Sequence, residues 1–264
     1  MRILSPELDL ERFFERVGQV RSRVLLLDYD GTLSPFTPDR DRAYPYPGMR
    51  KILNAMLEDG GTRVVLVSGR AVRDLVPLLG LEELPEIWGS HGHERLLPDG
   101  TYRPPRLSEL TAKGLADARA WIGEHDLTER CEEKPASLAV HTRGMETSRA
   151  EEIHGRVAVH WNALAGRSGL EIHRFDGGIE LRVPGMNKGS AVDAILAETD
   201  SETVSAYMGD DLTDEDAFGA IKGRGLAILV RGEYRPTDAD LWLVPPDEVL
   251  QFLERWLSAS GGER

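Results

Sequence analysis

Two aspartates that follow a short apolar run are the first residues in the chain that could do chemistry. Asp28 and Asp30 come directly after the apolar residues 24–27 and before Gly31. A run that is apolar throughout and too short for a helix predicts a central strand buried on both faces. Ligands of open α/β sheets bind beyond the carboxyl ends of the strands, so both carboxylates are expected where catalysis takes place. Because Asp and Gly are also frequent in plain polar turns, the pair alone leaves that simpler interpretation open.

Further polar residues follow other predicted strands or begin helices. Ser68 follows a second apolar strand, Lys188 begins a helix, and Asp210 and Asp214 follow a third strand. Each has an ordinary explanation when taken by itself. The serine could cap a helix, the lysine could be solvated, and the acids could lie in a first helical turn, where the helix dipole favours them.

Taken together, these residue types indicate phosphoryl transfer. Carboxylates that converge at one end of a sheet repel each other unless a hard divalent cation lies among them. Oxygen ligands with few nearby histidines favour Mg²⁺ over zinc. A hydroxyl and an ammonium beside such a metal are suited to a phosphoryl group. An aspartate could then attack phosphorus, and a second could protonate the leaving alcohol and later activate water.

The elements that must position these residues alternate between strand and helix. This alternation runs through the first 90 residues and resumes after residue 184, which predicts a parallel sheet with right-handed crossovers. The predicted core strands are residues 24–27, 62–67, 87–88, 204–208, 225–230 and 241–244. The predicted core helices include residues 7–19 and about 71–79, and three more helices have apolar residues within 49–57, 191–196 and 249–256.

The middle of the chain has a different pattern. Residues 109–125 and 146–166 are predicted helices, and each precedes two predicted strands. The strands are residues 129–133, 137–142, 170–175 and 179–183, with Asp176, Gly177 and Gly178 as a hairpin turn. This αββαββ order predicts an α+β domain at residues 108–183, inserted between core segments 1–107 and 184–264.

Composition limits the kinds of partner. The net charge of −13 argues against general affinity for nucleic acid or for an anionic membrane surface. No apolar stretch approaches the length of a membrane span, and the N-terminus does not look like a signal peptide. The lone cysteine, Cys131, is expected to be a packed residue and fits a reducing cytoplasm. An anionic substrate would need a metal or well-placed cations to overcome the field of the protein.

The order and spacing of the polar residues resemble the four motifs of the haloacid dehalogenase (HAD) superfamily. The matching segments are residues 28–33, Ser68, Lys188 and residues 209–214. The resemblance implies a Rossmannoid parallel-sheet core, and the inserted segment looks like a C2B-type cap. It further implies Asp28 as nucleophile, Asp30 as general acid and base, and Ser68 and Lys188 as stabilisers of the phosphoryl group. The implied Mg²⁺ ligands are Asp28, the backbone carbonyl of Asp30, Asp210 and, directly or through an intervening ligand, Asp214.

Finer features are similar to trehalose-6-phosphate phosphatases. They are residues 27–35, 67–70, 89–94 and 209–218 in the core, and 132–143 and 180–189 at the inserted segment. This resemblance implies hydrolysis of trehalose 6-phosphate and a functional pairing with a trehalose-6-phosphate synthase. The substrate-binding residues it implies are Ser68, Gly69, Arg70, His91, Glu132, Lys134, Arg143 and Glu180. From the residues alone, the charged stretch from Glu132 to Lys134 could equally be a solvated strand.

Other functions stay open at this point. A capped phosphatase could act on another sugar phosphate, such as a glucosyl- or mannosyl-3-phosphoglycerate or sucrose 6-phosphate, and a phosphosugar mutase is a further alternative. A phospho-acceptor signalling domain also gathers acids, a hydroxyl and a lysine around Mg²⁺, although such domains lack an inserted cap. A sensor that binds a sugar phosphate without turnover is the remaining alternative.

Overall fold

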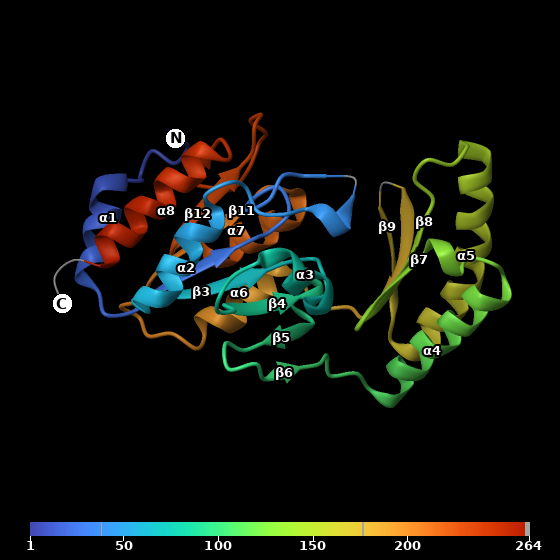
Figure 1. Ribbon diagram of the computed structural model, residues 1–264. Coiled ribbons are helices and arrows are strands. Elements are labelled where there is room, and N and C mark those ends of the chain that lie inside the picture. The colour runs from blue at the N-terminus through green and yellow to red at the C-terminus, as the bar shows by residue number, and fades with distance from the viewer. Residues whose placement is uncertain (38, 176, 262–264) are drawn as a thin grey trace. The chain divides into compact units, whose positions relative to one another are not determined.

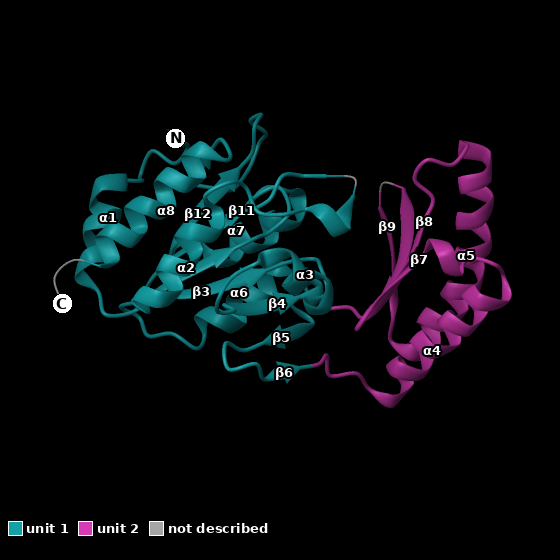
Figure 2. Ribbon diagram, viewed as in Figure 1, with its two compact units in different colours: residues 1–103, 186–264 teal, residues 104–185 magenta. Residues whose placement is uncertain are grey.

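The computed structural model describes residues 1–37, 39–175 and 177–261. The chain divides into two compact units (Figure 2). Unit 1 comprises residues 1–103 and 186–264, and unit 2 comprises residues 104–185. The division lies at 103/104 and 185/186, whereas the predicted boundaries are at 107/108 and 183/184.

Unit 1 is organised around a sheet that contains nine strands within the described residues. Their order is β1-β13-β12-β11-β2-β3-β4-β5-β6 (Figure 1). The strands are β1 (Arg2–Ile3), β2 (Arg23–Leu27), β3 (Arg63–Val67), β4 (Glu86–Gly89), β5 (Glu94–Leu96), β6 (Tyr102–Arg103), β11 (Val204–Gly209), β12 (Leu226–Val230) and β13 (Leu241–Leu243).

The six strands from β13 to β4 in this order are parallel, as the sequence predicts. Strand β2 is hydrogen-bonded to β3 on one side and to β11 on the other. The strand order therefore reverses at β2, and the carboxyl end of β2 is the switch point where such sheets bind ligands. The short strands β1, β5 and β6, toward the two ends of the sheet, are antiparallel to their neighbours and were not predicted, because two or three residues are too few to show a periodic pattern.

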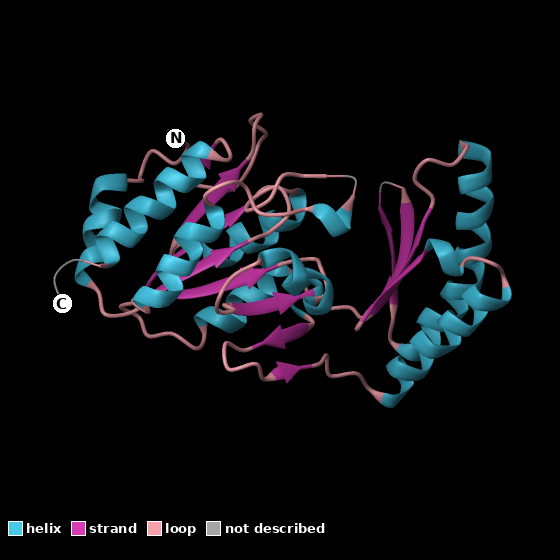
Figure 3. Cartoon of the chain, in the orientation of Figure 1, coloured by secondary structure: helices cyan, strands magenta, loops and turns pink. Residues whose placement is uncertain are grey.

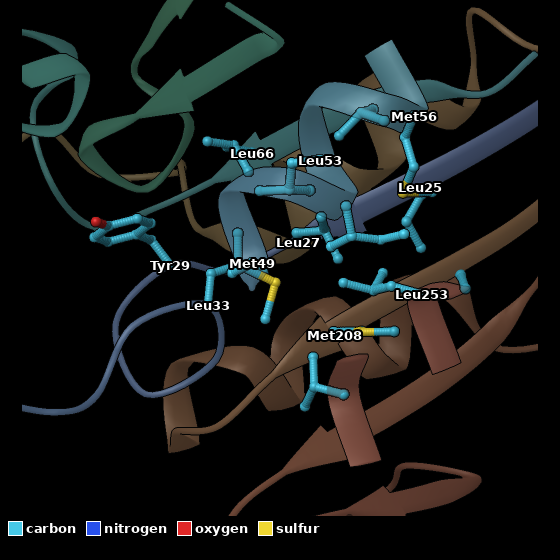
Figure 4. Close-up of a cluster of buried hydrophobic side chains, with 14 of the residues drawn as sticks. Leu25, Leu27, Tyr29, Leu33, Met49, Leu53, Met56, Leu66, Met208 and Leu253 are labelled. Atoms are coloured by element: carbon cyan, nitrogen blue, oxygen red, sulfur yellow. The ribbon is translucent and has the colours of Figure 1, made fainter. Parts of the chain in front are cut away.

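Helices cover both faces of this sheet. Helices α1, α2, α3 and α8 pack on one face, and α6 and α7 pack on the other. Figure 4 shows the first face, where Leu25, Leu27 and Leu66 of the sheet meet Leu53 of α2 and Leu253 of α8. The helices are α1 (Leu10–Gln19), α2 (Met49–Asp59), α3 (Val72–Leu79), α6 (Lys188–Leu196), α7 (Glu215–Ile221) and α8 (Asp247–Ser260). With both faces covered, the central strands are buried throughout, which explains their unbroken apolar sequence.

Unit 2 has the predicted αββαββ order. Its elements are α4 (Glu109–Glu124), β7 (Cys131–Lys134), β8 (Ser137–His141), α5 (Thr147–Ser168), β9 (Glu171–Phe175) and β10 (Gly178–Arg182). Within the described part of unit 2, the strands form one antiparallel sheet in the order β7-β8-β10-β9. Both helices pack on one face of this sheet (Figure 3). The β9–β10 hairpin forms as predicted, and its turn residue Asp176 lies outside the described residues.

Two element boundaries differ from the prediction. The helix expected at residues 7–19 begins at Leu10, because the side chain of Asp9 accepts a hydrogen bond from the Arg12 amide and caps the helix there. The strand expected at 129–133 is wrong at its start. Residues Thr128–Arg130 form a 3-10 turn, and β7 follows it as Cys131–Lys134.

Candidate functional site

A buried ion pair lies at the carboxyl end of β2. Asp28 follows this strand directly, and its amide donates to the carbonyl of Met208 on the neighbouring β11. Lys188, the first residue of α6, donates from Nζ to Oδ1 of Asp28 at 2.7 Å. Asn187 caps this helix through the amide of Ser190, which fixes where the helix begins. Asp28 is 3% and Lys188 4% exposed, so the pair is held almost entirely within the protein.

The loop after β11 brings a second carboxylate to the same lysine. Lys188 Nζ also donates to Oδ1 of Asp214 at 2.8 Å, and the Tyr207 hydroxyl donates to that oxygen at 2.5 Å. Oδ2 of Asp214 accepts the amides of Asp210 and Asp211 at 3.2 and 3.0 Å. A carboxylate offers about four acceptor positions. Asp214 is fully buried with four donors on it, so it organises the loop that carries Asp210.

Asp30 lies beside this group and has a different partner. Its two carboxylate oxygens accept from Nε and Nη2 of Arg70 at 2.6 and 2.7 Å, in a bidentate pair. The third guanidinium nitrogen, Nη1, donates to the carbonyl of Arg40 at 2.7 Å. The structure thus places the Arg70 guanidinium on Asp30 and on the backbone of the loop between β2 and α2.

The turn after β3 is joined to the turn after β4. Ser68 is 1% exposed, and its Oγ accepts the amide of Arg70 at 3.1 Å. The Ser68 carbonyl accepts the amide of His91 at 2.9 Å. The His91 ring packs on Gly69 so closely that a Cβ there would lie 2.7 Å from Cε1 of the ring. Ser68, Gly69, Arg70 and His91, all predicted to bind substrate, therefore share one pair of interlocked turns.

Unit 2 gathers three of its four predicted residues. Glu132, Lys134 and Glu180 lie on one side of the sheet, and the Lys134 Nζ is 3.8 Å from a Glu132 oxygen and 3.9 Å from a Glu180 oxygen. Ser137 Oγ donates to Glu180 at 2.7 Å, and His141 Nε2 is 2.8 Å from Glu132. Both of these neighbours were missed as site residues. The fourth predicted residue, Arg143, lies beyond the end of β8, next to Gly177.

Comparison with known proteins decides the family. The family model described as Trehalose-phosphatase matches residues 26–241, which contain all of unit 2 and most of unit 1. The chain belongs to the trehalose-phosphatase family. A trehalose-phosphate phosphatase of Mycobacterium marinum is 33% identical over 248 residues, which cover 89% of this chain and 61% of that protein. The chain spans 57% to 61% of the length of this and two further mycobacterial relatives.

Solved structures support the same fold for this family member. A trehalose-6-phosphate phosphatase related protein superposes with a TM-score of 0.69 and 25% identity, covering 89% of this chain and 97% of that one. A haloacid dehalogenase-like hydrolase from B. subtilis superposes with a TM-score of 0.59 and 15% identity, covering 88% and 99%. The predicted HAD-like core with an inserted α+β unit is confirmed. No helix in the described ranges is long and apolar enough to cross a membrane.

The buried charges of this site shift one another's pKa values. Burial raises the pKa of Asp28 well above its ordinary value, and Asp214 and Asp210 add to this effect while Lys188 opposes it. Burial and the charge of Asp214 raise the pKa of Asp210 to about 7. Burial alone would lower the pKa of Lys188, but Asp214 and Asp28 raise it, so the lysine stays cationic. Three carboxyl groups, Asp28, Asp210 and Asp214, surround the single buried ammonium of Lys188. A further cation would therefore stabilise the ionised form of this group.

The same acids fit a hard divalent cation. Asp28, Asp210 and Asp214 each offer a carboxylate oxygen within 4.8 Å of the others, and all the donors are oxygen. Gly31 makes room for this group, because a Cβ at that position would lie 2.1 Å from Oδ2 of Asp210. Since Asp214 already accepts four hydrogen bonds, the donor set favours Asp28 and Asp210 as direct ligands.

One residue of the site, Tyr207, carries no strong sequence signal. Tyr207 is fully buried, and burial together with Asp214 raises the pKa of its hydroxyl well above the ordinary value. Its only signal is a phenol in an apolar strand just before the acidic turn. Cys131 is half-buried, and burial raises the pKa of its thiol to about 11, which fits the packing role expected for it.

Proposed function

We propose that this chain is a Mg²⁺-dependent phosphatase that hydrolyses trehalose 6-phosphate to trehalose and phosphate. The observation that carries the proposal is the buried Asp28–Lys188 pair, with Asp30 two residues farther on. A buried carboxylate held against an ammonium is positioned as a nucleophile toward phosphorus. The family membership and the names of the relatives support the choice of substrate.

The reaction would proceed in two steps through this chain's own residues. In the first, an Asp28 oxygen bonds to phosphorus, the bond from phosphorus to the sugar oxygen breaks, and Asp30 gives its proton to that oxygen. In the second, Asp30 takes a proton from water, whose oxygen attacks phosphorus, and the aspartyl-phosphate bond breaks. Lys188 balances the negative charge on Asp28, and Ser68 is proposed to contact the phosphoryl oxygens.

Mg²⁺ would be held by Asp28, Asp210 and the backbone carbonyl of Asp30, with Asp214 fixing the loop. When bound, it would neutralise charge on the phosphoryl group. Without it, burial and the neighbouring carboxylates raise the pKa of Asp210 to about 7.

The sugar is proposed to be bound by Glu132, Lys134 and Glu180 of unit 2, together with Arg143. Clustered carboxylate and ammonium groups suit the hydroxyls of a polyol, and the hydrogen bonds of Ser137 and His141 hold the carboxylates in place. The lone cysteine favours action in the cytoplasm. A synthase that makes trehalose 6-phosphate would be the functional partner.

The test is phosphate release in Mg²⁺ from trehalose 6-phosphate, sucrose 6-phosphate, glucosyl- and mannosyl-3-phosphoglycerate and glucose 6-phosphate. We expect strong preference for trehalose 6-phosphate, loss of release in EDTA, and no turnover by Asp28→Asn. Preference for another member of the panel would contradict the substrate but keep the mechanism. Substantial activity of Asp28→Asn would contradict the nucleophile.

A further inference from the structure

Arg70 is buried, and each nitrogen of its guanidinium donates a hydrogen bond to the protein. The side chain is 4% exposed, and each of its three nitrogens donates to a protein oxygen at 2.6 to 2.7 Å. Two of the acceptors are the carboxylate oxygens of Asp30, and the third is the carbonyl of Arg40. A residue that recognises an incoming phosphate needs donors that the substrate can reach. The geometry of Arg70 is that of an internal support.

The backbone of Arg70 is anchored as firmly as its side chain. Its amide donates to Oγ of Ser68, and its carbonyl accepts the amide of Ser90 at 2.7 Å. The guanidinium also lies 5.8 Å from the centre of the Tyr29 ring, whose hydroxyl donates to the Ala43 carbonyl. The residue therefore links the turn after β3 to the turn after β2.

Asp30 itself is less constrained by its surroundings. Its side chain is 31% exposed, and it follows Asp28 in a turn that Gly31 allows through a φ of 79°. The side chain of an aspartate on such a turn can adopt several rotamers. The bidentate pair with Arg70 fixes the plane of the carboxylate and uses about two of its four acceptor positions, which leaves one position on each oxygen for a proton.

We infer that Arg70 is a positioning residue that holds the Asp30 carboxylate in the orientation needed to pass a proton to the leaving group and from water, and does not itself bind the phosphoryl group. This inference rests on the proposed function, in which Asp30 is the general acid and base. It changes the role of Arg70 from substrate ligand to support.

The test compares two leaving groups. A sugar alkoxide needs a proton to depart, whereas p-nitrophenolate does not. For Arg70→Gln with trehalose 6-phosphate we expect kcat to fall about 10-fold to 100-fold and KM to change less than about 3-fold. With p-nitrophenyl phosphate, the pre-steady-state burst of nitrophenolate should stay within about 3-fold of wild type, because that step needs no general acid. Steady-state turnover should fall, because hydrolysis of the intermediate needs the base.

A double-mutant cycle completes the test. Arg70→Gln combined with Asp30→Asn should be no slower than Asp30→Asn alone, because Arg70 acts only through Asp30. Arg70→Lys should recover part of kcat, since one donor can be restored. The matched control is Arg73→Gln, an arginine 67% exposed on α3, which should leave both substrates unaffected.

Three results would contradict the positioning role of Arg70. A burst slowed as much as turnover, a KM raised more than about 10-fold, or additive losses in the double variant would each overturn the inference and make Arg70 a substrate ligand. If Arg70→Gln does not fold, the same comparisons apply to Arg70→Lys. A wild-type protein that cleaves a different sugar phosphate defeats only the proposed substrate, and the comparison is then made with that ester.

Discussion

The hydroxyl of Tyr207 donates a 2.5 Å hydrogen bond to Oδ1 of Asp214, and both side chains are fully buried. The tyrosine belongs to β11, and the aspartate belongs to the loop that follows the same strand. A residue of β11 thus fixes the loop that follows β11. Asp214 in turn accepts hydrogen bonds from Lys188 and from two backbone amides of that loop. The order of the site depends on a phenol that would take no part in the chemistry.

Removing this hydroxyl should weaken the fold more than the catalysis. Tyr207→Phe deletes one donor to a buried carboxylate, which we expect to lower the free energy of unfolding by about 1.5–3 kcal/mol. Because Lys188 still reaches Asp214, kcat should fall less than about 10-fold. Urea unfolding and steady-state kinetics measure the two effects. Tyr234→Phe, at a 47% exposed tyrosine, is the control and should change stability by less than about 0.5 kcal/mol.

Substitution of Gly31 should be destabilising for two reasons, its positive φ and the Asp210 carboxylate beside it. Gly31 and Gly100 have φ of 79° and 83°, but a Cβ at Gly100 meets no atom within 4 Å, whereas at Gly31 it would collide with the Asp210 carboxylate. We expect Gly100→Ala to cost about 1–2 kcal/mol of left-handed strain. Gly31→Ala should lose more stability and also the response to Mg²⁺. Equal losses in a thermal-shift assay would show that the collision is relieved at no cost.

Metal binding should be visible as stabilisation. Mg²⁺ placed among Asp28, Asp210 and Asp214 would relieve their repulsion in the folded state only, so the melting temperature should rise with Mg²⁺ and fall in EDTA. Asp210→Asn should reduce this shift. Asp216→Asn removes an exposed acid from the neighbouring helix and should leave the shift unchanged. An Asp210→Asn variant with the full Mg²⁺ shift would exclude Asp210 as a ligand.

The metal-free protein should lose stability as pH rises toward neutrality. The pKa of Asp210 is about 7 in the folded protein against an ordinary value of 3.8, so between these values the folded state binds more protons than the unfolded state. Stability must then fall as pH rises through this window. Urea unfolding in EDTA at about pH 5 and about pH 7 should show a smaller fall for Asp210→Asn than for wild type. A larger loss of stability in Asp210→Asn than in wild type would contradict the raised pKa of Asp210.

Lys134 should affect binding of the sugar and not the chemistry. It lies between two carboxylates of unit 2, and Lys134→Gln would remove a donor and leave Glu132 and Glu180 without the charge between them. We expect KM for trehalose 6-phosphate to rise about 10-fold, with p-nitrophenyl phosphate hydrolysis unchanged. Lys113→Gln, 71% exposed on α4, is the matched control. Equal losses for both substrates would contradict a role in sugar recognition.

Much of the core site could be predicted because it depends on strand ends. Apolar runs fix where buried strands stop, and parallel strands end at one edge, so Asp28, Ser68 and Asp210 had to approach one another. Lys188 was predictable from its motif and from the start of its helix. The order of helices and strands in unit 2 could be predicted because its apolar patterns extend over enough residues to distinguish helix from strand.

The remaining features depend on tertiary contacts that leave no local pattern. The partner of Arg70 is 40 residues away in sequence, so no spacing rule points to Asp30. Tyr207 looks like any aromatic residue of a buried strand until the loop after it folds back. The start of β7 depends on its pairing with β8, because Cys131 is the first residue with a partner there. The edge strand β1 is extended because it pairs with β13.

The position of β2 between β3 and β11 also constrains how a cell can make this protein. During translation, β2 and β3 leave the ribosome early, but β11 follows only after all of unit 2 has been synthesised. Until then one edge of an apolar strand has no partner, and an unpaired edge is a template for aggregation. Nascent chains that stop before residue 204 should therefore need chaperones to stay in solution, because the sheet around β2 is completed only when β11 has been synthesised.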